Sequence, residues 1–476
     1  MPEPILSIAE IRDREERTWA AGVTQESVIR RAGAAVAAVA MRLTRPDAPV
    51  LVLAGKGHNG SDAVVAEEHL ADRDTVLLRM HEHDPRVLDS AHQWLEQFKG
   101  RQDALIIDGL FGIGLSRPVE DDWRRLVETV NASGLRVLSV DVPSGLNADT
   151  GEPMGVAIEA AVTLTLGSVK KGLLTEPATR YVGRLELAHD IGLVPGPELA
   201  ELLWTLDGDF SGYPPRRPEA SHKGTFGHVA VLAGSMGYHG AAVLTARGAL
   251  RARPGLVTVY TEERVYPAVA AQLQAAMVRP WRGDRLPENV FSAFVVGPGL
   301  AAEGLSPAIR DEVCRLWTSA PQAVVADATA LDWLPRAIAA EAGYRVVTPH
   351  PGEAARLLGV TVGEVQSDRV AAVRRISALW RGADVFTVLK GRHTVVGGAS
   401  GIVHINGTGN PGLAQGGTGD VLAGYLGGWL AQPTLHQDVG QAIRFGVWRH
   451  GAAADALEAR GFAWTAEDLA GALHGL

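Results

Sequence analysis

The sequence predicts an α/β protein with two domains, each built on a doubly wound sheet of mostly parallel strands. The chain has 476 residues, which is long for a single hydrophobic core. Short apolar runs recur along it, and many of them lead through a glycine-rich turn into a helical pattern. The stretch 208–221 concentrates glycine, proline and polar residues. We therefore expect a first domain at 1–207, a linker at 208–221 and a second domain at 222–476.

Composition and charge limit the class of partner. The formal net charge is −9, which argues against a dedicated nucleic-acid-binding protein, because such proteins present a basic face. Cys314 is the single cysteine, so no intrachain disulfide can form. The first residues lack the apolar segment of a signal peptide, and no apolar run is long enough to span a membrane. We expect a cytoplasmic protein that binds small molecules.

The first half is expected to begin with two helices, an amphipathic one that contains Ile8, Ile11 and Trp19 and an alanine-rich one at 28–41. Apolar runs then predict strands at 49–54, 75–80, 104–108, 137–141, 162–166 and 183–187. Helices are expected at 63–71 and 85–98. The first strand leads into the turn 55–62, an arrangement that can bring backbone N–H groups to a pyrophosphate, although any tight turn uses glycine and asparagine.

Acidic residues end two of these strands. Asp108 and Asp141 each precede a glycine-rich loop, and Ser144 lies in the second loop. Because the carboxyl ends of parallel strands line the ligand crevice of an open sheet, we expect both acids to converge there with the loop that contains Asn59. Each acid could instead cap the segment that follows it. Together these side chains offer hard oxygen ligands for an alkali or alkaline-earth cation.

The second half repeats the pattern of strand, loop and helix. Strands are expected at 228–232, 257–260, 293–296, 323–327, 345–348, 385–391, 394–396 and 403–406. The glycine-rich loop 234–241 opens an alanine-rich helix, and a further helix is expected at 354–358. In the first half, Lys170 and Lys171 could meet an anionic ligand, although exposed lysine pairs are usually solvated.

The stretch 410–424, which reads NPGLAQGGTGDVLAG, carries the strongest chemical signal. Gly416 to Gly419 can expose consecutive N–H groups, and the apolar run 421–430 predicts a buried helix behind them. Such a helix N-terminus is an anion site. Asp420 fits a base that deprotonates a hydroxyl as it attacks a phosphoryl group held by the loop. The alternative is that Asp420 is a helix cap in the first turn.

Two sets of motifs resemble one family, the bifunctional NAD(P)H-hydrate repair enzymes. The motifs in the second half are HKGTFGHVAVLAGS at 222–235, GPGL at 297–300, DATAL at 327–331, TPHPGE at 348–353, LKG at 389–391 and the 410–424 stretch. Those in the first half are DGLFGIGLSRPV at 108–119 and VDVPSGLNADTG at 140–151. The resemblance covers nearly the whole chain. It implies a Rossmann-like epimerase domain followed by a ribokinase-like dehydratase domain that depends on ATP or ADP.

For the second domain, the resemblance implies that Asp420 is the catalytic acid/base. It implies an adenine-nucleotide site made of Lys390, Gly391, Arg392, His393, Thr394, Gly416, Gly417, Thr418 and Gly419. The hydrated nicotinamide nucleotide would contact Ala241, Gly299, His350 and Asp420. Mg²⁺ is expected with the nucleotide, and Glu353 is the residue expected to help place it through water.

For the first domain, the resemblance implies a K⁺ site of Asn59, Asp108 and Ser144, and Asp141 as a catalytic residue. It implies substrate contacts by His58, Asn59, Gly60, Ser61, Asp62, Gly112, Ile113, Gly114, Leu115, Ser116, Arg117, Pro118 and Asp141. The family typically has N-N-G-G-D-G where this chain has HNGSDA at 58–63. Ala63 is expected to open the following helix at little cost. Ser61 either crowds the substrate phosphates or donates a hydrogen bond to them, and we expect the epimerase to remain active.

The implied function is repair of NADH or NADPH that has gained water across the nicotinamide ring. The first domain would interconvert the R and S 6-hydroxy forms, and the second would dehydrate the S form at the expense of ADP or ATP. The rival is a ribokinase-like small-molecule kinase with a degenerate N-terminal binding domain, which would yield a stable phosphate ester. We also expect a homo-oligomer. Preferences for ADP or ATP and for NADH or NADPH remain open.

Overall fold

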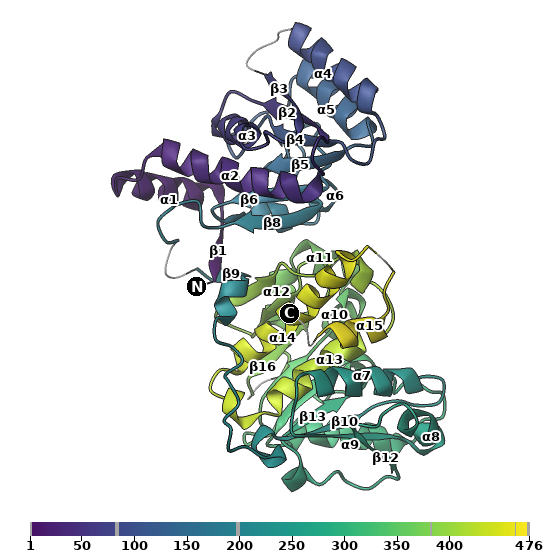
Figure 1. Cartoon of the computed structure of the whole chain (residues 1–476). Coiled ribbons are helices and arrows are strands. Elements are labelled where there is room, and N and C mark those ends of the chain that lie inside the picture. The colour runs from purple at the N-terminus through teal and green to yellow at the C-terminus, as the bar shows by residue number, and fades with distance from the viewer. Residues whose placement is uncertain (1, 81–84, 197–199, 381–382, 462, 474–476) are drawn as a thin grey trace. The chain divides into compact units, whose positions relative to one another are not determined.

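The computed structural model describes residues 2–80, 85–196, 200–380, 383–461 and 463–473. Contacts divide the chain into two compact units, Glu3–Ala200 and Glu201–Leu476 (Figure 1). This division falls before the predicted boundary at 207/208, because β9 (Leu202–Thr205) pairs with β18 (Val403–Asn406) and Phe210 is buried in the core of the second unit. No helix within the described ranges is both long and apolar enough to cross a membrane.

The main sheet of the first unit is parallel, with strand order β3-β2-β4-β5-β6-β8. These strands are β2 (Pro49–Ala54), β3 (Asp74–Arg79), β4 (Leu105–Gly109), β5 (Arg136–Val140), β6 (Val162–Leu166) and β8 (Arg184–Ala188). A short parallel pair joins β1 (Glu3–Leu6) to β7 (Val169–Lys170). The chain runs from β2 to β3 on one side and then to β4 on the other, so the switch point lies between β2 and β4. Ligands bind at the carboxyl ends of strands at such a point.

Helices cover both faces of this sheet. They are α1 (Ile8–Ala20), α2 (Gln25–Leu43), α3 (His58–Glu68), α4 (Pro85–Phe98), α5 (Asp121–Ala132) and α6 (Thr179–Val182). One core cluster joins α2 and α3 to one face of the sheet, and another joins α4 and α5 to the opposite face. Figure 1 shows α4 and α5 side by side. The central strands are buried on both sides, which explains their continuous apolar sequence.

The helix after β2 begins at His58, so the predicted start at Ala63 is wrong. A Cβ atom on Gly60 would lie 1.9 Å from the carbonyl oxygen of Gly55, and one on Gly109 would lie 2.6 Å from the Cβ of Ala63. The first turns of α3 therefore pack directly on the neighbouring backbone. This packing imposes a helix on residues whose local preference is for a turn, and Ala63 is buried in the helix interior.

The sheet of the second unit has the order β12-β11-β10-β13-β14-β15-β16-β17-β18-β9. Its remaining strands are β10 (His228–Leu232), β11 (Leu256–Glu262), β12 (Met277–Trp281), β13 (Ala293–Val296), β14 (Ala323–Ala326), β15 (Arg345–Val347), β16 (Val385–Leu389) and β17 (Val395–Gly397). Pairing is parallel from β12 to β16, and β17 runs antiparallel to both neighbours. The prediction of two α/β units with largely parallel sheets is confirmed.

The helices of the second unit place one buried helix at the centre. They are α7 (His239–Arg251), α8 (Tyr266–Ala270), α9 (Pro307–Ser319), α10 (Pro351–Leu358), α11 (Val362–Ser367), α12 (Arg369–Ser377), α13 (Thr418–Leu430), α14 (Val439–Glu458) and α15 (Ala466–Ala472). Every residue of α13 from Val421 onward is buried, as predicted. Glycines let α13 approach α7, because a Cβ atom on Gly424 would lie 1.8 Å from the Thr245 carbonyl oxygen. The N-terminus of α13 is thus held by a tightly packed core.

Candidate active sites

The first unit contains a cavity of about 640 Å³ at the carboxyl ends of its strands. Many of the predicted substrate contacts line it, namely His58, Asn59, Asp62, Gly112, Ile113, Gly114, Leu115, Ser116, Arg117 and Asp141. Gly60, Ser61 and Pro118 are described residues that do not line it. Gly60 packs against the backbone behind the cavity, and the Ser61 hydroxyl lies 3.5 Å from the Gly57 carbonyl oxygen. The predicted residues therefore converge on one site, with the altered Ser61 turned back along its helix.

The N-terminus of α3 opens toward this cavity. Gly57 occupies the N-cap position, where it provides no side-chain hydrogen bond to the first turn. The first N–H groups of a helix have no partner within the helix, so those at the start of α3 remain available to an anion. The backbone arrangement expected for a phosphate site is thus present, although the helix begins earlier than predicted.

The three residues predicted to bind a cation lie together beneath the cavity. Asp108 is fully buried, and its carboxylate accepts hydrogen bonds from the Ser144 hydroxyl (2.5 Å), the Ser144 N–H (2.9 Å) and the Ser139 hydroxyl (2.8 Å). The Asn59 amide nitrogen donates to the Phe111 carbonyl (2.9 Å), while the Asn59 Oδ1 atom is buried without a partner among the described residues. Burial raises the pKa of Asp108, and the hydrogen bonds from Ser144 and Ser139 oppose that rise.

Asp141 follows β5 with a left-handed backbone, at φ 65°, a conformation that non-glycine residues seldom adopt outside turns and functional sites. Its carboxylate accepts hydrogen bonds from the Leu166 N–H (2.9 Å) and from the ammonium group of Lys170. Lys170 is buried, so the expectation of a solvated lysine pair is wrong for this residue. Lys171 forms an ion pair with Glu10 at 2.9 Å. The contact between Lys170 and Asp141 could not be predicted from sequence, because the two residues lie at the ends of separate strands that only the fold brings together.

Two further carboxyl groups line the cavity near Asp141. Burial and then the charge of Asp141 raise the pKa of Asp62 well above its ordinary value, and Lys170 opposes this rise. The same two causes raise the pKa of Glu15. Glu15, which lies on α1, was not predicted as a site residue. Three carboxyl groups, those of Glu15, Asp62 and Asp141, therefore line the same cavity.

In the second unit, the predicted anion site lies at the N-terminus of α13. Gly417 is the N-cap residue, with φ 97°, and a Cβ atom there would lie 2.5 Å from the side chain of Leu244. As a glycine, this residue has no side chain with which to cap the helix. His450 contacts the Thr418 carbonyl oxygen at 3.0 Å, and burial lowers the pKa of His450 to about 4, so its ring is neutral and donates this bond.

Asp420 lies in the first turn of α13 but makes no capping hydrogen bond among the described residues. Burial, followed by the charge of Asp327, raises the pKa of Asp420 to about 7, and Lys390 opposes the rise. Accepting a backbone hydrogen bond would instead favour the ionised form and lower the pKa. The arrangement favours the interpretation of Asp420 as a base over its interpretation as a cap.

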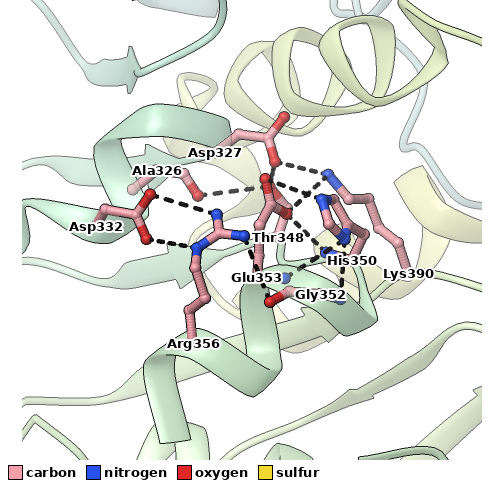
Figure 2. Close-up of polar contacts among 9 residues, drawn as sticks. All are labelled: Ala326, Asp327, Asp332, Thr348, His350, Gly352, Glu353, Arg356 and Lys390. Carbon is pink, nitrogen blue, oxygen red and sulfur yellow. Dashed lines mark hydrogen bonds and ion pairs between the residues drawn. The ribbon is translucent and has the colours of Figure 1, made fainter. Parts of the chain in front are cut away.

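Figure 2 shows Lys390 together with two acids, Asp327 and Glu353. The Lys390 ammonium group lies 2.7 Å from Asp327 and 4.0 Å from Glu353. Burial would lower the pKa of Lys390, but Asp327, Glu353 and Asp420 raise it. A Cβ atom on Gly419 would lie 3.2 Å from the same nitrogen, so Lys390 reaches the start of α13. Asp327 was not predicted as a site residue, although it directly follows β14 as Asp141 directly follows β5.

The residues predicted to contact substrate lie on neighbouring loops. The His350 ring accepts hydrogen bonds from the backbone N–H groups of Gly352 (3.0 Å) and Glu353 (3.4 Å). In return, the Glu353 carboxylate accepts a hydrogen bond from the backbone N–H of His350 (2.8 Å; Figure 2). This reciprocal cap fixes both residues at the start of α10. A Cβ atom on Gly299 would lie 2.7 Å from that of Ala241, so these two positions touch. The structure thus places His350 with Glu353, and Ala241 with Gly299.

The predicted nucleotide segment 390–394 forms the turn between β16 and β17. Gly391 has φ 135° and His393 has φ 52°. The Thr394 hydroxyl donates to the Gly391 carbonyl at 3.3 Å. Burial lowers the pKa of His393 to about 3, with the charges of Arg392 and Arg369 adding to the effect. The turn therefore contains a neutral histidine in an electropositive environment.

Comparisons with known proteins match both units. Residues 229–474 match the family described as NAD(P)H-hydrate dehydratase, and residues 25–172 match the YjeF-related protein N-terminus. The chain is 37% identical to a bifunctional NAD(P)H-hydrate repair enzyme Nnr of Gloeobacter violaceus, covering 96% of this chain and 94% of that protein. It is 36% identical to the enzyme of the same name from Escherichia coli, covering 94% and 88% of the two chains.

Among solved structures, the chain resembles the ADP/ATP-dependent NAD(P)H-hydrate dehydratase from Bacillus subtilis co-crystallised with ATP/Mg²⁺. The sequence identity is 34%, the TM-score is 0.48, and the match covers 54% of this chain and 91% of that one.

Proposed function

The chain belongs to the family of bifunctional NAD(P)H-hydrate repair enzymes, and we propose that its two units divide the two reactions of that family between them. The enzyme repairs hydrated NADH and NADPH. It interconverts the R and S 6-hydroxy forms, and it dehydrates the S form to NAD(P)H at the expense of ADP or ATP. We assign the epimerase reaction to the cavity of the first unit and the dehydratase reaction to the N-terminus of α13.

In the dehydratase reaction, Asp420 takes the proton from the 6-hydroxyl group. The oxygen then attacks the terminal phosphoryl group of ADP or ATP, and the remainder of the nucleotide leaves. Phosphate next departs from C6 and a proton from C5, which restores the double bond. The N–H groups at 416–419 would stabilise the charge that develops on the phosphoryl oxygens. The ammonium group of Lys390, which lies beside Gly419, would add a positive charge at the same place.

The observation that carries this assignment is the state of Asp420. The carboxyl group stands at an uncapped helix N-terminus, and its pKa is about 7. A base with a pKa near the working pH combines a useful ionised fraction with a strong tendency to accept a proton. Burial raises the pKa of Asp420 most, the charge of Asp327 adds to the rise, and the charge of Lys390 opposes it.

The metal expected in the second unit would accompany the nucleotide. Among the described residues, no group of three or more His, Cys, Asp and Glu side chains is placed to hold a metal ion. The Glu353 carboxylate already accepts the His350 N–H. Mg²⁺ would therefore be held chiefly by phosphate oxygens, with Glu353 contributing through water, and it would neutralise charge on the phosphates.

In the epimerase unit, the donor set beneath the cavity fits K⁺. The described partners of the buried Asp108 carboxylate are hydroxyl and N–H groups, without a cationic side chain, and the Asn59 Oδ1 atom lacks a donor. A monovalent cation held by Asn59, Asp108 and Ser144 would satisfy both. Asp141, fixed by Lys170 and the Leu166 N–H, would act at C6, while the start of α3 would hold substrate phosphate. A cytoplasmic location accords with the single cysteine.

An assay of the full chain tests the function. Purified protein is incubated with hydrated NADH and either ADP or ATP, and both the absorbance of reduced nicotinamide and free phosphate are followed. We expect NADH and phosphate to appear in equal amounts. A stable phosphate ester in their place would identify a kinase and overturn the proposal.

A further inference from the structure

Arg369 lies directly against the proposed nucleotide segment. It is the first residue of α12, and its guanidinium donates to the carbonyl groups of Leu389 (3.0 Å) and Lys390 (3.2 Å) at the end of β16. A Cβ atom on Gly391 would lie 3.0 Å from its Nη1 atom. The positive group therefore packs on the backbone of the turn that begins at Lys390.

The charge of Arg369 has no carboxylate partner among the described residues. Its remaining hydrogen bond goes to the Gln366 side chain at 2.6 Å, and its Nε atom is buried without an acceptor. The carboxylate of the adjacent Asp368 accepts from the Ala371 N–H instead, at 2.8 Å. Burial lowers the pKa of Arg369 to about 10. Arg369 is half-buried, and a partly desolvated cation without a carboxylate beside it favours an anionic ligand.

Arg345 shows how this fold accommodates a buried arginine with a structural role. Its guanidinium is buried and donates to carbonyl groups at the C-terminal end of α9, among them those of Trp317 (2.6 Å) and Ala320 (2.7 Å). A cation is favourable at a helix C-terminus. Arg369 differs from Arg345 because it begins helix α12 and its guanidinium lies against the turn that follows β16, not at a helix C-terminus.

The turn beside Arg369 has a conformation suited to an anion. Gly391 and His393 both have positive φ angles, at 135° and 52°, and left-handed residues in a turn can direct successive N–H groups toward one point. We propose that Arg369 binds the phosphate chain of ADP or ATP together with the backbone of residues 390–394. This inference rests on the proposed dehydratase function and adds to it a specificity-determining residue for phosphate.

Binding of two probes, ADP and adenosine, tests the inference on the full chain by isothermal titration calorimetry. We expect Arg369→Gln to weaken ADP binding by about 10- to 100-fold, as for loss of a charge-assisted hydrogen bond to phosphate. Adenosine, which lacks phosphate, should bind within about twofold of wild type on the same reasoning. Arg375→Gln is the matched control, because Arg375 is an exposed arginine of the same helix, and it should change neither affinity.

Two results would overturn the inference. Unchanged ADP affinity in Arg369→Gln would mean that the guanidinium does not contact phosphate. Equal losses for ADP and adenosine would mean that Arg369 only shapes the turn. Failure of wild-type protein to bind ADP at all would refute the proposed nucleotide site itself.

If Arg369→Gln shows no cooperative thermal unfolding transition, a second variant provides the test. Arg369→Lys keeps the charge while losing the planar fork. We expect it to fold and to weaken ADP binding severalfold while leaving adenosine binding unchanged. Equal losses for the two probes would again contradict a phosphate contact.

Discussion

The two carboxylates proposed for catalysis are held in opposite ways. Asp141 stands in a left-handed conformation and accepts hydrogen bonds from Lys170 and the Leu166 N–H. Asp420 occupies an ordinary helical position without a hydrogen bond among the described residues, and its pKa is about 7. Each has a lysine nearby, but Lys390 is engaged by Asp327 at 2.7 Å and acts on Asp420 only through its field.

This difference indicates how each acid is used. A carboxylate fixed by a buried lysine is oriented for action at one atom of a substrate. A carboxylate that lacks partners and is surrounded by other acids changes charge near neutral pH. We therefore propose that the first site depends on the orientation of Asp141, whereas the second depends on the burial of Asp420 and the charges around it.

The largest expected effect comes from Asp420→Asn. We expect dehydratase turnover to fall by at least about 100-fold, since general-base catalysis contributes on that order. Nucleotide affinity should stay within severalfold of wild type, because the amide keeps the shape of the side chain. Steady-state assays with titration of ADP measure both quantities. Turnover near wild type would show that Asp420 is not the base.

The pH dependence of dehydratase turnover should follow the ionisation of Asp420. Asp420 must be ionised to take a proton, and its raised pKa means that the neutral form dominates below about pH 7. We therefore expect turnover to fall about tenfold per pH unit below that value and to level off above it. A flat profile between about pH 5 and about pH 8 would contradict the assignment of Asp420 as the base.

The smallest expected effect comes from Ser61→Gly, which restores the usual residue of the family at the epimerase loop. The Ser61 hydroxyl lies near the Gly57 carbonyl oxygen and outside the cavity lining. We therefore expect epimerase activity to change by about twofold or less. An increase of tenfold or more would show that Ser61 crowds the substrate phosphates.

The central strands of both sheets could be predicted from sequence, because strands buried on both faces have continuous apolar runs. The predicted ranges for β2, β6 and β13 agree with the structure. The edge strand β12 was missed, since only Trp281 of its residues is buried and Pro280 interrupts the run. β9 was missed because its place depends on pairing with β18, which lies about two hundred residues away along the chain.

The candidate sites were predictable where the motif itself supplies the chemistry. Asp420 and the glycines before it fall into this class, as do Asp108 and Asp141 at strand ends. The pairing of Lys170 with Asp141 and that of Lys390 with Asp327 could not be predicted, because each joins separate elements of the fold. The start of α3 at His58 could not be predicted, because glycine and asparagine in its first turn locally favour a turn. The packing of Gly60 on Gly55 and of Ala63 on Gly109 overrides that preference.

The most direct test of a division of labour between Asp141 and Asp420 uses a mixture of both hydrate epimers with excess nucleotide. Wild-type protein and Asp141→Ala are compared as the dehydratase exhausts the S form. We expect wild type to continue consuming the remaining epimer, faster when K⁺ is added, and Asp141→Ala to stop at the slow spontaneous rate. If both proteins leave the same amount of the remaining epimer and consume it at the same slow spontaneous rate, the first unit does not catalyse epimerisation, which contradicts the proposed role of Asp141.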